Sequence, residues 1–359
     1  MAKIVNICDV CSEIFAGGDA PKGNMSETKT EEYNIPIYAN GEANEGLYGY
    51  TNKARVTKPS ITVSARGTIG YTAIRPTPFV PIVRLITLTP NPELIDIKYL
   101  YYAAQNYKFD GSGTSIPQLT VPSLKKYSFP LPAMEEQAHI VMILDNVCDL
   151  IDQKKQQLEL LDELVKSHFI ELFGDPNTNP MKWKKEQLQI NATLLNGRAY
   201  KQDELLDDGK YPVLRVGNFF SNRGWYYSDL ELDEDKYCDD GDLLYAWSAS
   251  FGPRIWNGGK VIYHYHIWKV LVGEKYNKQF LCHLLDYATA SFMGDTHGIG
   301  MMHLTKSGME ETEFIVPPID LQNQFATFVE QTDKSKLAIQ QSLDKLELLK
   351  KSLMQEYFG

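Results

Sequence analysis

The chain has 359 residues, of which 43% are hydrophobic and 23% are charged, so it carries enough apolar material for ordinary globular cores. This composition excludes a mostly disordered chain, and no apolar run approaches the roughly 18 residues of a membrane span. The 5 cysteines form an odd and sparse set, which favours a reducing cytoplasm over a disulfide framework. The amino terminus shows no export signal, so we expect a cytoplasmic protein without membrane association.

The formal net charge of −10 comes from 36 basic and 46 acidic residues that are unevenly distributed. Residues 133–180 hold 3 basic and 10 acidic residues, whereas residues 1–132 hold 13 and 11. Residues 181–317 hold 15 and 19, and residues 318–359 hold 5 and 6. The acid is thus concentrated in one stretch. A nucleic-acid surface elsewhere is not excluded, although the bulk charge gives it no support.

Residues 1–133 form the first predicted globule. Short β-rich runs occupy residues 33–90, namely IPIYAN, ARV, SITVSARGTIGYTAI and FVPIVRLITL, and Gly, Asn and Pro separate them. The segment IDIKYLYYAAQNY that follows predicts a short helix. Strands and a helix in this order indicate a mixed α+β globule.

Residues 134–174 predict a long helical spacer. Apolar residues recur there in alternating steps of three and four, and no Pro or Gly interrupts them before Gly174. The seam positions of this stripe are Ile140, Leu144, Val147, Ile151, Leu158, Leu161, Val165 and Leu172.

Residues 175–318 form a second predicted globule, after an Asn179-Pro180 linker that stops the helix. Its β-rich runs are KYPVLRVGNFF, GDLLYAWSAS and GGKVIYHYHIWKVLV, and NKQFLCHLLDYATASF predicts a helix. Residues 319–359 then predict a second spacer helix. Its seam positions are Phe325, Val329, Ile339, Leu343, Leu346 and Leu353.

The chain is a tandem repeat with an offset of 185 residues. Phe129 matches Phe314, Gln137 matches Gln322, and the register continues without a gap to IELFG at 170–174 and QEYFG at 355–359. A single heptad stripe packs on its own domain in the ordinary case. Two matching stripes are better explained by pairing with each other, which predicts an antiparallel coiled coil and a pseudo-twofold α+β fold.

This organisation resembles the specificity (S) subunit of type I restriction-modification systems. SARGTIG at 64–70 and GSGTSIPQLTVPSLKKYSFPLPAMEEQ at 111–137 carry the resemblance in the first half. HGIGMMHLTKSGMEETEFIVPPIDLQNQF at 297–325 carries it in the second half. The resemblance implies two target-recognition domains, at residues 1–133 and 175–318, that each read one half of a bipartite, asymmetric duplex DNA site.

The same resemblance implies partners. Two methyltransferase (M) subunits would dock on the helical regions, and motor-nuclease (R) subunits would join the complex. S-adenosylmethionine, ATP and Mg are then expected on those partner subunits, and none of them on this chain.

Catalytic chemistry is missing from the sequence. It contains neither the Asn/Asp-Pro-Pro-aromatic element of amino-methyltransferases nor a GxxxxGK[ST] phosphate loop, so we expect a non-catalytic protein. Cys8 and Cys11 form a C-x-x-C without a second pair, which disfavours zinc. His264 and His266 alternate in a predicted strand, which places both imidazoles on one face, but no third ligand is near in sequence. No metal site is expected.

Base readout needs side chains that present paired donors or acceptors, such as Arg to guanine and Asn to adenine. Loops on a rigid scaffold present such groups best, although each candidate could equally be a solvated charge or a turn-forming Asn. Arg66 and Arg254 stand out because each lies beside a glycine in predicted corresponding turns. The candidates are Asn40, Asn44, Lys53, Arg55, Arg66, Thr68, Arg215, Asn218, Asn222, Arg223, Trp225, Ser248, Ser250 and Arg254.

A second hypothesis keeps the repeat and the heptads but changes the ligand. In it, the chain is a coiled-coil scaffold whose globules bind protein or glycan, which explains the net acidity more easily. An adjacent methyltransferase gene would favour the first hypothesis.

Overall fold

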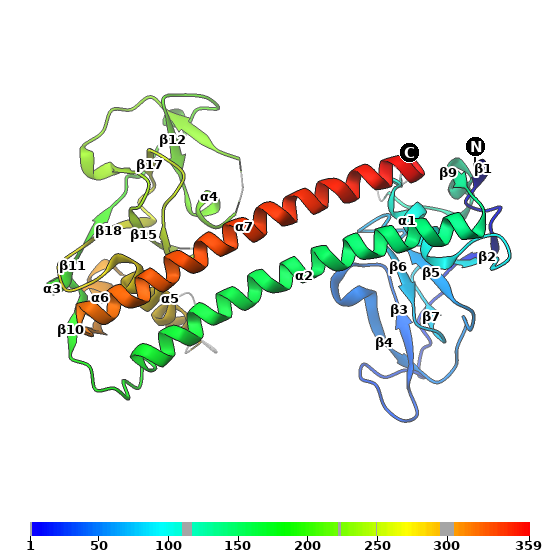
Figure 1. Cartoon of the computed structure of the whole chain (residues 1–359), viewed down its shortest axis with the longest axis horizontal. Helices are drawn as coiled ribbons and strands as arrows, with labels where there is room; N and C mark the ends of the chain where they lie inside the picture. The colour runs from blue at the N-terminus through cyan, green and yellow to red at the C-terminus, as the bar shows by residue number, and fades with distance from the viewer. Residues whose placement is uncertain (1, 110–116, 222–223, 249, 295–304) are drawn as a thin grey trace. The chain divides into compact units, whose positions relative to one another are not determined.

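The computed structural model describes residues 2–109, 117–221, 224–248, 250–294 and 305–359. The chain divides into two compact units, drawn in one colour ramp in Figure 1. Unit 1 consists of the residues up to Gln156 together with Gln340–Gly359, and unit 2 is the continuous stretch Gln157–Ile339. Each unit mixes helices and sheets, which confirms the predicted α+β class. Among the described residues, no helix has the length and apolar character needed to cross a membrane.

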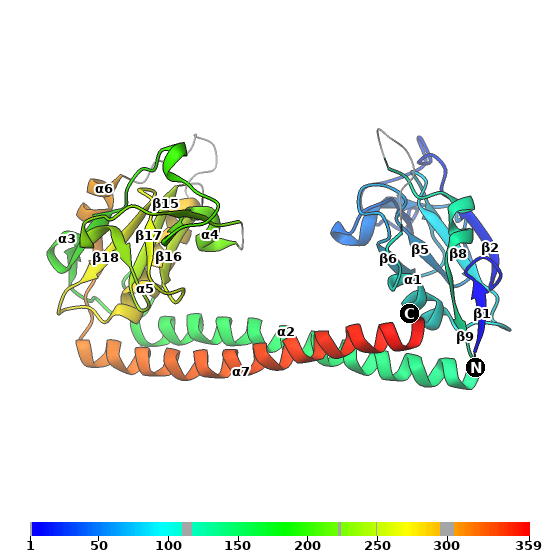
Figure 2. The ribbon, with the colours of Figure 1, turned by 90° about the horizontal axis from the view of Figure 1, so that it is seen from above.

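Unit 1 is built on a four-stranded sheet of order β2-β8-β5-β6, visible edge to edge in Figure 2. A three-stranded sheet, β4-β3-β7, and the pair β1-β9 complete the globule. Helix α1, Ile97–Gln105, packs on β5 and β6. The strands are β1 Lys3–Asn6, β2 Cys11–Ala16, β3 Ile35–Tyr38, β4 Leu47–Thr51, β5 Ser60–Val63, β6 Thr72–Arg75, β7 Val80–Pro81, β8 Ile86–Pro90 and β9 Ser128–Leu131, and the 3-10 turns are η1 Ala43–Gly46 and η2 Val121–Lys126.

Unit 2 repeats this topology. Its sheet β11-β18-β15-β16 corresponds to β2-β8-β5-β6, its sheet β13-β12-β17 corresponds to β4-β3-β7 with β14 added, and β10-β19 corresponds to β1-β9. The elements are β10 Lys185–Gln187, α3 Leu188–Asn191, β11 Ala192–Asn196, η3 Gln202–Glu204, β12 Tyr211–Leu214, α4 Val216–Phe220, β13 Tyr226–Ser228, η4 Glu234–Lys236, β14 Tyr237–Cys238, β15 Leu243–Ser248, β16 Ser250–Ile255, β17 Val261–Tyr263, β18 Ile267–Val272, α5 Lys278–Gly294, α6 Lys306–Glu311 and β19 Glu313–Ile315.

The segment VGNFF differs from its prediction. It was expected to continue a β-rich run, but Val216–Phe220 forms the short helix α4. The side chain of Asn218 accepts a hydrogen bond from the Arg215 backbone N–H at 3.4 Å, and so it caps the start of the helix. Local capping therefore outweighs the β propensity of the flanking valine and phenylalanines.

Two forty-residue helices, α2 (Met134–Phe173) and α7 (Ile319–Phe358), pack together. In unit 1, Ile140 and Leu144 of α2 share a core cluster with Met354 and Phe358 of α7. Because the start of α2 meets the end of α7, the helices are antiparallel, as predicted.

The opposite ends of the two helices pair in unit 2. There Val165 and Phe169 of α2 share a cluster with Phe325 and Val329 of α7. All the seam positions named from the heptad stripe are buried or half-buried. The buried ones are Ile140, Leu144, Val147, Ile151, Val165, Phe325, Val329 and Leu343, and the half-buried ones are Leu158, Leu161, Leu172, Ile339, Leu346 and Leu353.

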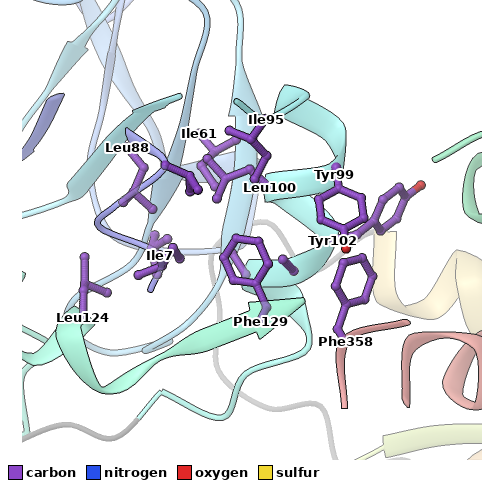
Figure 3. Packing of buried hydrophobic residues seen from close by; sticks show 14 of the residues in the cluster. Ile7, Ile61, Leu88, Ile95, Tyr99, Leu100, Tyr102, Leu124, Phe129 and Phe358 are labelled. Atoms are coloured by element: carbon purple, nitrogen blue, oxygen red, sulfur yellow. The ribbon is translucent and has the colours of Figure 1, made fainter. Parts of the chain in front are cut away.

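The last aromatic residue of α7 completes the core of unit 1. Figure 3 shows Phe358 facing Tyr99 of α1, with Phe129 of β9 nearby, and the ring centroids of Tyr99 and Phe358 are 5.0 Å apart. In unit 2 the last residue of α2, Phe173, packs on Phe280 at 4.6 Å. Each long helix thus begins in one unit and ends in the core of the other.

A buried glutamine fixes the start of α2 in unit 1. The Gln137 Oε1 atom accepts a hydrogen bond from the Asp96 backbone N–H at 2.9 Å. Its amide nitrogen donates to the carbonyls of Leu94 at 3.1 Å and Pro132 at 3.0 Å. The side chain therefore satisfies three backbone groups that would otherwise lack partners.

The same network occurs at the start of α7 in unit 2. The Gln322 Oε1 atom accepts from the Asn277 backbone N–H at 2.9 Å, and the amide nitrogen donates to the carbonyls of Lys275 at 3.0 Å and Pro317 at 2.8 Å. Gln137 and Gln322 are both fully buried. The 185-residue repeat is therefore also a repeat of polar contacts.

Gln137→Leu should destabilise unit 1 by about 2–5 kcal/mol, because one N–H and two carbonyl groups lose their partner in a buried position. Gln322→Leu should do the same to unit 2. Calorimetric or denaturant unfolding of each variant, with limited proteolysis to identify the affected unit, measures the effect.

The matched control is Gln153→Leu, because Gln153 lies exposed on the same helix as Gln137. This control should change the free energy of unfolding by no more than about 0.5 kcal/mol. Equal stability of Gln137→Leu and Gln153→Leu would contradict the role of the network.

Candidate functional site

In unit 1, the side-chain amide of Asn40 forms hydrogen bonds to two neighbouring loops. The Asn40 Oδ1 atom accepts from the Ala65 backbone N–H at 2.7 Å, and its Nδ2 atom donates to the Val83 carbonyl at 2.5 Å. The loops after β3, β5 and β7 therefore meet at Asn40. Its donor and its acceptor are both used inside the protein, which favours a positioning role.

Arg66 and Thr68 lie exposed on the loop between β5 and β6, as the predicted turn requires. Both the Nε and the Nη2 atoms of Arg66 donate to the Gln118 Oε1 atom, at 3.0 and 2.7 Å. Gly67 has a φ of +68° and open space around it, so the glycine permits the left-handed turn.

The other candidates of unit 1 are exposed near the same loops. The Arg55 guanidinium lies over the Phe15 ring at 4.4 Å, a cation–π contact that holds it in place. Asn44 has a φ of 48° in the 3-10 turn η1, which places this residue in a left-handed backbone. Lys53 lies exposed between β4 and β5.

Three candidate residues of unit 2, Arg215, Asn218 and Trp225, line a cleft of about 660 Å³. The Arg215 guanidinium lies 5.2 Å from the centre of the Tyr226 ring. The Asn218 Nδ2 atom donates to the Gly224 carbonyl at 3.2 Å, and Trp225 packs against Trp256. The cleft combines aromatic stacking surfaces with one positive charge, Arg215, and one negative charge, Asp207.

Two histidines line the same cleft, but they are not on a strand. The sequence predicted alternation of His264 and His266 along one strand, whereas the chain turns at Tyr265 and His266, between β17 and β18. Tyr265 N–H bonding to the Arg198 carbonyl at 3.0 Å and Ile267 N–H bonding to the His264 carbonyl at 2.9 Å hold this turn. A sequence alternation alone could not reveal these backbone contacts.

The two imidazoles are close, with ring centroids 4.7 Å apart. Burial, together with the neighbouring His266 and Arg215, lowers the pKa of His264 to about 4. Burial and Arg215 also lower the pKa of His266. His264 is therefore neutral near pH 7, so its ring can both donate and accept hydrogen bonds.

Arg254 does not lie in a turn that corresponds to that of Arg66. It is in strand β16 opposite Leu244, and Gly252 pairs with Ala246 in the same ladder. Arg254 Nη1 donates to the Phe219 carbonyl at 2.5 Å, so this side chain ties β16 to α4.

Of the remaining candidates of unit 2, two lie where strands β15 and β16 meet in their hairpin, and two lie outside the residues that the structure describes. Ser248 and Ser250 pair directly across the hairpin. Asn222 and Arg223 lie outside the described residues.

In the described part of the chain, no group of three or more His, Cys, Asp or Glu side chains is arranged to hold a metal ion. The Cys11 thiol donates to the Ile7 carbonyl at 3.3 Å, and burial raises its pKa to about 12. A protonated, buried thiol is a poor metal ligand. The geometry supports binding through hydrogen bonds, stacking and charge.

Arg84, which is not among the candidates named from the sequence, is exposed in the turn between β7 and β8 and follows Val83, whose carbonyl accepts from Asn40. Val83 and Arg84 have φ values of 51° and 67°. No glycine or asparagine marks these left-handed positions, so the sequence carried no turn signal there.

Comparison with known proteins finds relatives for both halves. Residues 2–161 and 180–349 match the family model described as type I restriction modification DNA specificity domain. A Mycoplasma pneumoniae protein with the provisional name type I specificity subunit S.MpnORF89P is 36% identical over 143 residues, or 40% of this chain and 42% of that protein. The type I restriction enzyme MjaIX specificity subunit of Methanocaldococcus jannaschii is 24% identical over 355 residues, or 88% of this chain and 80% of the relative.

The fold also matches solved structures. The S subunit of a type I restriction-modification system from M. genitalium aligns with a TM-score of 0.60 at 17% identity, covering 100% of this chain and 96% of that chain. At this identity the likeness concerns the fold. The chain matches only 42% and 39% of the length of two M. pneumoniae relatives.

Asn40→Ala should destabilise unit 1 by about 1–3 kcal/mol, because the Ala65 N–H and the Val83 carbonyl both lose their partner. Amide exchange at Ala65 should accelerate accordingly. Thermal unfolding and hydrogen exchange measure the two effects. Lys53→Ala, at an exposed site, is the control and should change stability by less than about 0.5 kcal/mol. Unchanged exchange at Ala65 in Asn40→Ala would refute the bridging role.

Proposed function

Because this chain belongs to the family of type I restriction modification DNA specificity domains, we propose that it is the DNA-reading subunit of a type I restriction-modification complex. The observation that carries the proposal is the doubled family match over residues 2–161 and 180–349. Each matched segment contributes most of one globule. In this proposal the chain itself is non-catalytic, and its two globules are the target-recognition domains.

The loops of the two globules support an asymmetric target. Both globules share one strand order, but unit 1 presents Arg66 on a loop between β5 and β6 where unit 2 has the hairpin of β15 and β16. Unit 2 instead offers an aromatic cleft with Arg215. Two globules with the same strand order but different loop side chains would read two different half-sites. The DNA target would then be bipartite and asymmetric.

Partner subunits would supply the chemistry. Two methyltransferase subunits, with S-adenosylmethionine as their cofactor, would dock on the helical regions. Motor-nuclease subunits, with ATP and Mg, would then join the complex. The two globules carry nearly balanced charges, with 13 basic and 11 acidic residues in 1–132 and 15 and 19 in 181–317, so the methyltransferase subunits would provide much of the phosphate affinity. The complex would act on double-stranded DNA in the cytoplasm.

The helical regions hold this assembly together in the proposal. The seam residues of α2 and α7, from Ile140 to Leu353, would keep the coiled coil in one register. The candidate side chains of the loops, including Arg66, Thr68, Arg215 and Trp225, would contact the two half-sites.

The purified chain alone should not methylate DNA, because the cofactor would bind to the methyltransferase subunit. Together with that subunit and S-adenosylmethionine, methyl groups should appear at one bipartite sequence. Long-read methylome mapping of a host with and without this gene measures the specificity, and tritiated methyl transfer in vitro measures the activity. Methyl transfer by the chain alone would refute the proposal.

A four-residue insertion should lengthen the spacer between the half-sites. A second copy of Leu158-Glu159-Leu160-Leu161, placed after Leu161, adds about 1.1 turns and about 6 Å to α2, so the apolar seam nearly keeps its face. Since duplex DNA rises ~3.4 Å per base pair, we expect the same half-sites separated by one or two additional base pairs. The methylome of the insertion strain measures the spacing.

The activity of the insertion variant should fall, because the unmodified α7 must accommodate the change. The control replaces only the exposed Glu159 and Leu160 by other helix-forming residues, without insertion and with the seam residue Leu161 unchanged, and it should preserve the spacing. Unchanged spacing at full activity would show that the helices do not set the distance between half-sites.

A further inference from the structure

Two short turns occupy equivalent places in the two units. The turn Ile82–Leu85 joins β7 to β8, and the turn His264–Ile267 joins β17 to β18. Leu85 N–H bonds to the Ile82 carbonyl at 3.0 Å, and Ile267 N–H bonds to the His264 carbonyl at 2.9 Å. The closing hydrogen bonds therefore agree, and both turns have the same length.

The neighbouring backbone holds each turn in the same way. Val83 N–H bonds to the Gly18 carbonyl at 2.7 Å, and Tyr265 N–H bonds to the Arg198 carbonyl at 3.0 Å. A Cβ atom on Gly17 would lie 2.7 Å from the Pro81 carbonyl group. At Gly197, the equivalent position of unit 2, a Cβ atom would lie 2.4 Å from the backbone oxygens of Tyr263 and His264. A side chain at either glycine would therefore collide with the backbone of the turn.

A side-chain donor fixes the tip of each turn. The Asn40 amide donates to the Val83 carbonyl at 2.5 Å, and the Trp247 indole N–H donates to the Tyr265 carbonyl at 2.9 Å. In the unit 1 turn, Val83 and Arg84 adopt positive φ values, which is rare for a β-branched residue such as Val83, whereas Tyr265 and His266 of the unit 2 turn do not. Such strain persists where surrounding contacts impose it, and it commonly marks functional positions.

The side chains at the tips are available for contact. Val83 is 46% exposed and Tyr265 is 39% exposed, although both are large apolar residues. Arg84 follows Val83 and is exposed as well. His266, the equivalent of Arg84, lines the cleft beside Arg215 and Trp225.

We propose that these two turns are the specificity-determining turns of the two units, with Arg84 contacting base edges in one half-site and His266 contacting them in the other. The inference rests on the proposed function and adds to it the residues that read sequence. Arg84 offers the guanidinium fork that matches a guanine edge, and its rigid turn limits the orientations that the fork can take.

The experiment uses the full chain with its methyltransferase subunit and S-adenosylmethionine. Methylation is measured on duplexes that carry the cognate site and on libraries in which one half-site is randomised. Arg84→Ala should lower methylation of the cognate site by roughly 5- to 150-fold and relax the sequence preference of one half-site only. His266→Ala should relax the other half-site only.

The controls separate charge and folding from base reading. Lys3→Ala in β1 and Lys185→Ala in the equivalent β10 remove exposed cations from matching strands, and both should leave the preference unchanged. Arg84→Lys keeps the charge but loses the fork, so its preference should relax as in Arg84→Ala. Melting temperatures equal to that of the wild type would show that the variants fold.

Each outcome decides one question. If the wild-type complex methylates no specific bipartite sequence, the proposed function fails. If the wild type is specific but folded Arg84→Ala and His266→Ala keep its sequence preference, the turns are not specificity-determining and this inference fails alone. A lower rate with an unchanged preference, restored by Arg84→Lys, would identify a phosphate contact and would also overturn base reading by Arg84.

Discussion

The burial of the last aromatic residue of each long helix constrains the rest of the molecule. Phe173 enters the core of unit 2 against Phe280, and Phe358 enters the core of unit 1 against Tyr99. An aromatic ring in a close-packed core cannot slide by one helical turn without opening a cavity. The register between α2 and α7 is therefore tied to the packing of the sheets at both ends, and the heptad seam needs only to be compatible with it.

The hydrogen bonds of the scaffold are the same in the two units, whereas those that support the loops differ. Gln137 and Gln322 satisfy equivalent backbone groups at the starts of the two long helices, so the scaffold repeats even in its hydrogen bonds. The tips of the loops do not repeat, since Asn40 supports one turn and Trp247 supports the other. One frame thus carries two different sets of exposed side chains, as an asymmetric reader would need.

The sequence predicted much of the scaffold and less of the site. The sequence shows the offset of 185 residues directly, as matching residues in the two halves. It also shows the spacing of apolar residues that predicts the heptad stripe and the helices after the strands. The turn at His266 and the strand position of Arg254 depend on backbone pairing between distant segments, which periodicity does not encode. The helix at Val216–Phe220 depends on a cap by Asn218, a contact that outweighs its β-rich composition.

The division of the chain into units also has a consequence for its synthesis. Unit 2 is one continuous stretch, Gln157–Ile339, so all of its residues are synthesised before Gln340–Gly359. Unit 1 needs Gln340–Gly359 as well, because Phe358 fills part of its core. The unit whose translation begins first therefore completes its core last, and until Phe358 is made the apolar surface around Tyr99 lacks a packing partner, which favours aggregation.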